Sequence, residues 1–323
     1  MWVFLYVNLV KKSLKLRKLE ALLKRGDKYS AIQKDVSIHL RGYKGEKELT
    51  YYLDFIPDKE CFIIHNLRLY DGKSYFQIDY LLLTHFFFII IDCKNYLGTL
   101  LLLFDTTLNQ FTRIRNNQEE GYLDPISQVK RLKRQLESFL RKSHFTIPHI
   151  EPIVIISKPS TIIKGNPSIK SHVLHSHSFL EKWDQLQRKY KGNILDDKNL
   201  RKISKFLRKH HTPDHTNVLE KYNLSKEDII TGVQCPHCMA FAMVRKKRSW
   251  FCRSCSTFDR KAHIKAVEDY FLLIKPSITS KEFREFVHIS SKNTANRLLV
   301  SMKLPYTGEN RGRIYYPTKD FLE

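Results

Sequence analysis

Two cysteine pairs with identical spacing constrain this chain more than any other feature of its sequence. Cys235 and Cys238 form one C-x₂-C pair, and Cys252 and Cys255 form a second pair a short distance further along. Each pair offers two thiolates from a single turn, and two such turns complete a tetrahedral site for Zn²⁺. The short separation is typical of a zinc ribbon, so we predict that these four cysteines hold one structural zinc ion. The alternatives are two disulfides or free thiols.

Cysteine usage and the N-terminus both favour a reducing compartment. Six cysteines in 323 residues are few for a secreted disulfide scaffold. The apolar run at residues 1–10 lacks a preceding basic region and is too short to span a bilayer. The apolar run at residues 80–91 is also short, is broken by Thr84 and His85, and favours two buried strands. We therefore expect a cytoplasmic protein without a membrane partner.

The charge balance points to a polyanionic partner. The formal net charge is +23, and a surface this cationic repels itself unless it attracts negative charge. Nucleic acid is the first candidate, and an anionic membrane surface is the second. With 323 residues, of which 42% are hydrophobic, the chain is long enough for two or three modules with real cores.

The first half of the chain has the pattern of an α/β module. Residues 11–35 are basic and polar with no strong apolar stripe, which predicts a solvated helical arm within residues 1–40. A helix is predicted from Gly42 to the residue before Pro57. Strands are then predicted on both sides of a hairpin turn at Asp71-Gly72-Lys73. Their ranges are 61–69, 75–84 and 86–94.

The remaining elements complete this module and connect it to the C-terminal part. The strands between residues 75 and 94 are nearly continuous in apolar residues, which indicates burial on both faces. A strand at 98–104, a basic amphipathic helix beginning near Pro125 and a buried strand at 150–157 follow. We therefore predict an α/β domain at residues 41–174, then a helical connector at 175–225 whose helical pattern covers residues 175–212.

Acidic and basic side chains gather where two predicted strands end. Asp92 and Lys94 share one face of their strand because side chains alternate, and Cys93 points away. A hairpin brings Asp79 of the preceding strand beside them. Two carboxylates at apolar strand ends repel each other and resist burial unless a cation joins them. Mg²⁺ or Mn²⁺ is the natural cation, since such ions prefer oxygen ligands and keep waters for substrate phosphates.

Two further residues are candidates for the same site. Glu46, on the predicted helix before the strands, is placed to complete the acidic cluster, and Gln128, at the start of the basic helix, is placed to hold the substrate backbone or a water. Lys94 is placed to hold a phosphate or orient the attacking water. The alternative is purely structural, because D-x-K is a short and common pattern. Asp92 and Lys94 would then cap a strand, and Asp79 would lie in a solvated turn.

These segments resemble the nuclease-related domain (NERD) family, part of the PD-(D/E)xK superfamily. The matching pieces are GYKGEKEL, FQIDYLLL, IIIDCKNYLGTL and, further on, DPISQVKRL, which together cover about the first half of the chain. The resemblance implies a restriction-endonuclease-like α/β core, a mixed sheet flanked by helices. It also implies a catalytic acid, a second acid, a lysine, a helix acid and a supporting glutamine at Asp79, Asp92, Lys94, Glu46 and Gln128. Many relatives have Glu at the position of Asp92, so the carboxylate here is set back by one methylene.

The predicted zinc ribbon, residues 226–261, carries a basic segment between its cysteine pairs. Positive charge beside Trp250 and Phe251 suits phosphate contacts and base stacking, so this segment is a candidate nucleic-acid surface. A hairpin tip rich in Lys and Arg is also common on soluble proteins of every kind. The candidate contact residues are Arg245, Lys246, Lys247 and Arg248.

The last segment, residues 262–323, has the pattern of a helix-turn-helix followed by a β-wing. A helix, a short extended piece, a second helix and a third helix capped by Ser290 or Ser291 precede a glycine-containing hairpin. In such motifs one helix enters the major groove of DNA. The alternative is a helical cap that packs on the ribbon. The residues expected to face DNA are Lys292, Asn293, Thr294, Asn296 and Arg297.

These features lead to one functional prediction and two rivals. The leading prediction is a metal-dependent phosphodiesterase that acts on DNA and is targeted by the zinc ribbon and the C-terminal helices. The first rival is a DNA-binding protein in DNA maintenance or regulation whose nuclease fold no longer cuts. The second rival is an RNA-processing nuclease, since neither phosphate contacts nor a metal site distinguish DNA from RNA.

Overall fold

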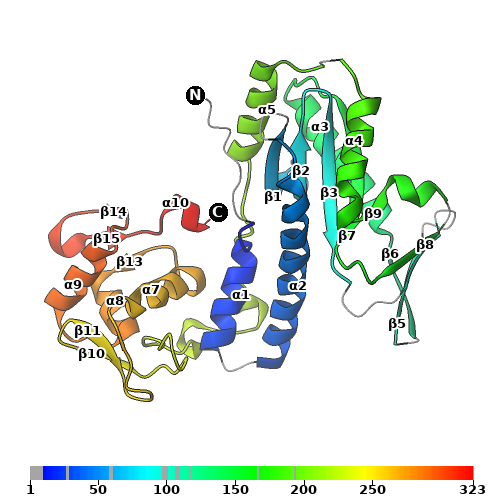
Figure 1. Ribbon diagram of the computed structural model, residues 1–323. Helices are drawn as coiled ribbons and strands as arrows, with labels where there is room; N and C mark the ends of the chain where they lie inside the picture. The colour runs from blue at the N-terminus through cyan, green and yellow to red at the C-terminus, as the bar shows by residue number, and fades with distance from the viewer. Residues whose placement is uncertain are drawn as a thin grey trace. The chain divides into compact units, whose positions relative to one another are not determined.

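The computed structural model describes residues 10–26, 29–57, 61–96, 101–105, 110–116, 118–165, 167–192 and 194–322 (Figure 1). The chain divides into two compact units. Unit 1 comprises residues 1–11 and 39–212, and unit 2 comprises residues 12–38 and 213–323. The apolar N-terminal run lies outside the described residues except for Val10. Among the described residues, no helix is both long and apolar enough to cross a membrane.

Unit 1 is built on a five-stranded mixed sheet in the order β1-β2-β3-β7-β9. The first three strands pair antiparallel, and β3, β7 and β9 pair parallel. The predicted hairpin is confirmed, with Tyr70 opposite Tyr75 and Gly72 at a positive φ of 98° in the turn. The strands are β1 (Phe62–Tyr70), β2 (Tyr75–Leu83), β3 (Phe87–Lys94), β7 (His149–Ile156) and β9 (Val173–His175).

Helices cover both faces of this sheet, which explains why its central strands are apolar on both sides. On one face the sheet packs against α3 (Pro125–Lys142) and α5 (Asp197–Lys209). On the other face it packs against α2 (Tyr29–Leu53) and α4 (Phe179–Lys189). The predicted α/β architecture of mixed sheets flanked by helices is thus confirmed.

Some helix bounds in this part differ from the prediction. The helix expected from Gly42 begins at Tyr29, so α2 contributes residues to both units. The helical pattern predicted for residues 175–212 corresponds to two separate helices. The first, α4, ends at Lys189, and the second, α5, begins at Asp197. Short 3-10 turns precede them at η1 (Pro167–Ser171) and η2 (Ser176–Ser178).

A second, four-stranded sheet of unit 1 has the order β6-β5-β4-β8. Of its four strands only β4 was predicted, at residues 98–104, and residues 98–100 of that prediction lie outside the described residues. The others carry many polar residues or are short, so their apolar periodicity is weak. The strands are β4 (Leu101–Asp105), β5 (Gln110–Arg115), β6 (Gln118–Leu123) and β8 (Ile162–Gly165).

Unit 2 begins with α1 (Leu14–Arg25), and here the prediction of a solvated arm is wrong. Leu14, Leu19 and Leu22 lie in the apolar core of the unit. These leucines form a stripe at helical spacing that the intervening lysines and arginines conceal in the sequence. Arg25, at the end of α1, is itself fully buried and pairs with Asp269 at 2.8 Å.

The four-cysteine segment of unit 2 contains a small antiparallel sheet. Its strands are β10 (Met243–Lys246), β11 (Ser249–Cys252) and β12 (Phe258–Asp259). Trp250 is fully buried and packs in the same apolar core as α1 and the C-terminal helices. Before this sheet lie α6 (Val218–Lys221) and the 3-10 turn η3 (Lys226–Asp228). The finer domain boundaries expected at residues 225 and 261 stay predictions.

The C-terminal part of unit 2 contains the helices and the hairpin expected from its sequence. Thr279 caps α8 through a reciprocal bond with Glu282, and Ser291 caps α9. The short strands form a sheet in the order β13-β15-β14. The elements are α7 (Ala262–Leu273), β13 (Ile278–Thr279), α8 (Ser280–Val287), α9 (Lys292–Ser301), β14 (Tyr306–Thr307), η4 (Asn310–Gly312), β15 (Ile314–Tyr315) and α10 (Lys319–Leu322).

Candidate active site and metal centre

The ladder between β2 and β3 ends one residue before the two predicted aspartates. The last backbone pair is Tyr80 with Ile91. Beyond it, the carboxylate of Asp79 replaces the backbone and accepts a hydrogen bond from the amide of Cys93 at 2.8 Å. Asp79 is therefore fixed at the end of β3, next to Asp92, by the local ending of the sheet.

Asp79 also lies where β2 changes its alternation. Phe76 and Ile78 pack on the α3 side of the sheet, whereas Tyr80 and Leu82 pack on the α2 side, so a strict period of two does not hold across Asp79. The facing part of β1 contains Asn66 in the left-handed conformation at φ 55°. Such a local irregularity re-aims side chains, as bulges next to active sites commonly do.

Lys94 joins the acidic residues to helix α3. Its Nζ lies 2.8 Å from Oδ2 of Asp92 and 3.1 Å from Oδ1. The same ammonium donates to Oε1 of Gln128 at 3.2 Å. Gln128 lies in the first turn of α3, which Asp124 caps through the amides of the next turn. Cys93 packs on the opposite face of the sheet, as the alternation predicts.

Burial and mutual repulsion raise the pKa values of the two aspartates in this cluster. Burial, followed by the charges of Asp92 and Glu46, raises the pKa of Asp79 well above its usual range. Burial also raises the pKa of Asp92, although the ammonium of Lys94 opposes that shift. For Lys94, burial would lower the pKa, but the charge and hydrogen bond of Asp92 outweigh it and raise the pKa.

Glu46, on α2, is held by a histidine that the sequence reasoning missed. Its Oε2 accepts a hydrogen bond from Nε2 of His65 at 2.7 Å, and the His65 side chain is only 7% exposed. The His65 ring packs on Tyr80 with centroids 4.9 Å apart, and the Tyr80 hydroxyl donates to the backbone oxygen of Glu46 at 2.9 Å. The available signal was a histidine in the largely apolar stretch CFIIHNLRL, since a buried polar group needs a partner.

A glycine allows α2 to approach the end of the sheet closely enough to place Glu46. A Cβ at Gly45 would lie 3.0 Å from Cβ of Asn95 and 3.1 Å from Oγ of Ser157. Asn95 follows β3 and donates through Nδ2 to the backbone oxygen of Arg41 at 3.1 Å. Asn95 and Gly45 therefore hold α2 against the ends of β3 and β7.

The structure thus brings the predicted residues of this site into one region of unit 1. Asp92, Lys94 and Gln128 are in contact, and Asp79 is close enough for its charge to act on Lys94. Glu46 acts on both aspartates through its charge while it is bonded to His65. Among the described residues, only the four cysteines bring three or more donor atoms within 4.8 Å of one another.

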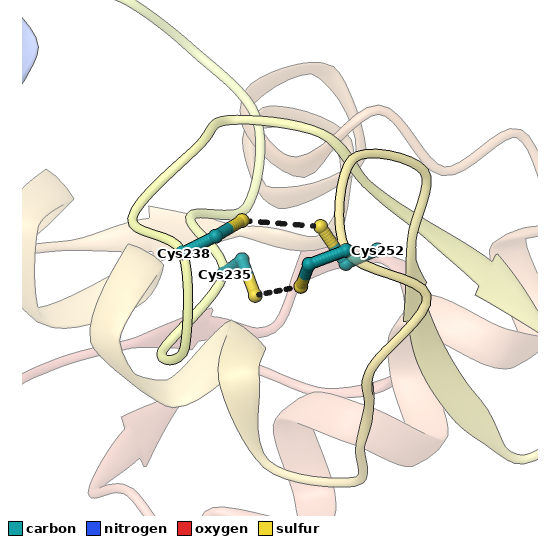
Figure 2. A group of neighbouring side chains, drawn as sticks. Cys235, Cys238 and Cys252 are labelled. Atoms are coloured by element: carbon teal, nitrogen blue, oxygen red, sulfur yellow. Dashed lines mark hydrogen bonds between the residues drawn. The ribbon is translucent and has the colours of Figure 1, made fainter.

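The four predicted cysteines lie together in unit 2. Figure 2 shows Cys235, Cys238 and Cys252 with their side chains turned toward one another. The sulfur atoms of Cys235 and Cys255 are 3.7 Å apart, and those of Cys238 and Cys252 are 3.6 Å apart. A disulfide requires about 2.05 Å, whereas Zn–S bonds of about 2.3 Å in a tetrahedron separate neighbouring sulfurs by about 3.8 Å. The cluster therefore has the form of a structural zinc site.

The backbone around the cysteines supports this arrangement. One residue after each pair adopts the left-handed conformation, with φ 63° at Met239 and φ 59° at Ser256. The amide of Cys235 donates to the oxygen of Ala240 at 2.8 Å, and the amide of Cys252 donates to the oxygen of Thr257 at 2.9 Å. Each C-x₂-C pair is thus a closed turn that holds its two thiols on one side.

The predicted nucleic-acid residues occupy two places in unit 2. In the β10–β11 hairpin, the Lys246 ammonium lies 3.9 Å from the Phe251 ring centroid, and the Arg245 guanidinium lies 5.5 Å from that of Trp250. Lys247 has a positive φ of 49° at the turn before Arg248. The second place is a cavity of about 600 Å³ beside α9. Its lining includes Lys292, Asn293, Asn296, Asn310 and Arg313.

Arg297, also on α9, does not line that cavity and contacts Thr294 at 3.5 Å. The described residues therefore place the predicted contact residues of α9 in two groups rather than on one continuous face. Both groups are basic or amide-bearing, which suits contacts to phosphates and base edges.

Comparison with known proteins found one family match, and it lies in unit 1. Residues 41–157 match the nuclease-related domain (NERD) family. The match includes Glu46, Asp79, Asp92, Lys94 and Gln128. The chain therefore contains a nuclease-related domain, as the resemblance implied. No curated protein and no solved structure matches the chain.

Proposed function

We propose that this protein is a divalent-metal-dependent nuclease that hydrolyses phosphodiester bonds of DNA. The observation that carries the proposal is the contact of Lys94 with both Asp92 and Gln128, beside Asp79, at the end of β3. A partly buried lysine between acids and a polar helix start is a suitable place for a phosphate, and it lies within a nuclease-related domain.

The carboxylates are suited to a hard cation. Mg²⁺ or Mn²⁺ would be held by Asp79, Asp92 and Glu46, because such ions prefer carboxylate oxygens. The raised pKa values of Asp79 and Asp92 support this fit, since burial and repulsion leave their negative charge incompletely compensated. When bound, the ion lowers the pKa of a water ligand and offsets charge that develops on the phosphate.

The surrounding side chains supply positioning. Lys94 can donate to a phosphate oxygen in place of Asp92 if another cation neutralises that acid. Gln128 of α3 orients the Lys94 ammonium through their hydrogen bond. His65 orients Glu46 by the 2.7 Å bond. Preorganised charges of this kind stabilise negative charge where it develops in the transition state.

Unit 2 is proposed to bind the nucleic acid. The four cysteines would hold one structural Zn²⁺, and α8, α9 and the β13-β15-β14 sheet would act as a winged helix-turn-helix. The two places described above would contact DNA through Arg245, Lys246, Lys247, Arg248, Lys292, Asn293 and Asn296, and Arg297 of α9 would add a further contact outside them. The net charge of +23 supports a polyanionic partner.

A single cleavage experiment tests the proposal. The full chain is incubated with single-stranded, duplex and branched DNA and with RNA, with EDTA, Mg²⁺ or Mn²⁺. We expect cleavage of DNA only with a divalent ion. Preference for RNA would replace DNA as the substrate class and favour the RNA-processing rival.

A non-cutting DNA-binding protein is the second candidate function, and one observation favours it. Glu46 is engaged by His65, Asp92 is engaged by Lys94, and the three carboxylates do not bring their oxygens within 4.8 Å of one another. Absence of cleavage with every divalent ion, in protein that still binds DNA, would decide for this candidate.

A further inference from the structure

A basic cavity of unit 1 lies at the open edge of the main sheet, separate from the side chains of the candidate active site. Its volume is about 760 Å³, within the size range of ligand pockets. It is lined by residues of β8, η1, β9 and α4. Because β9 is the last strand of the sheet, one of its backbone edges faces this cavity rather than another strand.

The strand register connects this cavity with Lys94. Lys94 of β3 is paired with Ile156 of β7, and Ile156 is paired with His175 of β9, which lines the cavity. Registered partners in a parallel sheet point to the same face. His175 therefore lies on the same face as Lys94, two strand spacings or about 10 Å away.

The charge of the cavity is predominantly positive. Lys164, Lys170 and Lys182 line it, and Glu181 is the acid among the lining residues. Lys182 is already engaged by Glu151 at 2.9 Å and by the backbone oxygen of Ser171 at 3.1 Å. Lys164 and Lys170 are exposed, and within the described residues neither has a carboxylate partner. Two such lysines beside one cavity favour binding of an anion that carries several phosphates.

We infer that this cavity binds the phosphate backbone of the nucleic-acid strand whose cleavage is proposed at Lys94, through Lys164 and Lys170. A distance of about 10 Å corresponds to about three stacked nucleotides at about 3.4 Å each along one strand. Ile156, which lies between Lys94 and His175 in the sheet, is fully buried, so the strand would run around the end of β7 rather than over its face. The His175 ring at the cavity is fixed by a 3.2 Å bond to the backbone oxygen of Ile156. The inference rests on the proposed function only in calling this strand a substrate.

Lysine footprinting of the wild-type full chain tests the site without requiring cleavage. The protein is acylated in EDTA, alone or with DNA strands longer or shorter than the span, and each lysine is quantified by mass spectrometry. Lys198 and Lys205 are matched controls, because both are exposed on α5 of the same unit. We expect long strands to lower acylation of Lys164 and Lys170 several-fold and to leave the controls unchanged.

Three outcomes would overturn the inference. In the first, Lys164 and Lys170 remain as reactive as the controls while a long strand is bound. In the second, short strands protect these two lysines as well as long strands do. In the third, inorganic phosphate alone protects them. The last two results would indicate a site for a single phosphate rather than for a strand.

A kinetic comparison separates this inference from the proposed function. On long substrates, K164A/K170A should raise KM about tenfold with little change in kcat, and K198A/K205A should change neither. Equal effects of both pairs would sink the inference but leave the nuclease proposal intact. If the wild-type protein does not cut, the nuclease proposal fails, and the footprint still decides whether the cavity binds a strand.

Discussion

The carboxylate of Asp79 on β2 accepts the backbone amide of Cys93 on β3, at 2.8 Å, where the ladder between the two strands has ended. This bond places a partly buried acid beside Asp92 and Lys94. Because the donor is the backbone amide of Cys93, the carboxylate of Asp79 is not held by a second, flexible side chain. The same arrangement forces two carboxylates together, and their mutual repulsion contributes to the raised pKa of Asp79.

Asp79→Asn should stabilise the metal-free protein while abolishing cleavage. The raised pKa means that the folded state holds a proton at pH values where the unfolded chain has lost it. The associated stability is therefore lost as pH rises from the unfolded pKa through the folded one. Asn accepts the Cys93 amide without a charge, so we expect a gain on the order of 1 kcal/mol at neutral pH.

Thermal and denaturant unfolding in EDTA measures this effect. Asp71→Asn is the matched control, because hydrogen bonds from the amides of Ser74 and Lys73 lower the pKa of Asp71 in an exposed turn. That variant should not be stabilised. Loss of stability in Asp79→Asn at neutral pH would contradict the assigned electrostatics.

Binding of Mn²⁺ or Mg²⁺ should strengthen as pH rises. A metal ion needs deprotonated carboxylates, and the pKa values of Asp79 and Asp92 are both raised. Binding should therefore release protons at pH values below the folded pKa values and release fewer above them. Calorimetry in buffers of different ionisation enthalpy measures this release. Affinity that is independent of pH would place the metal elsewhere.

Gly45→Ala should lower cleavage more than Gly42→Ala, although both replace a glycine in α2. At Gly45 the new Cβ would meet Asn95 at 3.0 Å and Ser157 at 3.1 Å, which forces α2 away from the sheet and displaces Glu46. At Gly42 its nearest neighbour is Glu46 Oε1 at 3.9 Å. Gly42→Ala should stabilise the helix by up to about 1 kcal/mol.

Cleavage rates and unfolding curves of these two variants provide the measurement. Equal activity of both variants, each folded, would show that the close approach of α2 does not position the site.

Zinc removal should unfold the four-cysteine segment without unfolding unit 1. The sulfurs of Cys235 and Cys252 lie in the same core as Trp250, so the metal contributes folding energy to that core. Elemental analysis should find one zinc per chain, and Cys235→Ser should lose it. Cys61→Ser, in unit 1, is the control and should retain it. Zinc-free protein with an intact, protease-resistant segment would refute this assignment.

The sequence predicted those parts of the fold whose signals are local. The hairpin at Asp71-Gly72-Lys73 has a strong turn signal. The two strands after it are apolar runs, a pattern that indicates buried strands when a turn bounds it. The C-x₂-C pairs likewise carry their own geometry. These elements also predicted that Asp79 lies beside Asp92 and Lys94, although Asp79 is in the middle of β2, where only the ladder to β3 has ended, and not at a strand end.

The missed features depend on contacts between distant parts of the chain. α1 was expected in solvent because its row of leucines can be recognised as a buried face only when the residues of unit 2 that it packs against are known. The role of His65 could be found only by knowing that α2 places Glu46 beside His65 of β1 and Tyr80 of β2. The strands β5 and β6 are exposed or polar on much of their length, so pairing rather than periodicity defines them.

Cleavage by wild-type, Lys94→Ala and Asp92→Glu protein, compared in one assay, tests the central claim most directly. Each variant must keep the wild-type thermal transition. We expect divalent-dependent DNA cleavage by the wild type and a rate at least about 100-fold lower for Lys94→Ala. Asp92→Glu restores the acid common in the related family and should retain or raise activity. A wild type that cuts no nucleic acid with any divalent ion, or Lys94→Ala that cuts as fast as wild type, would contradict the account.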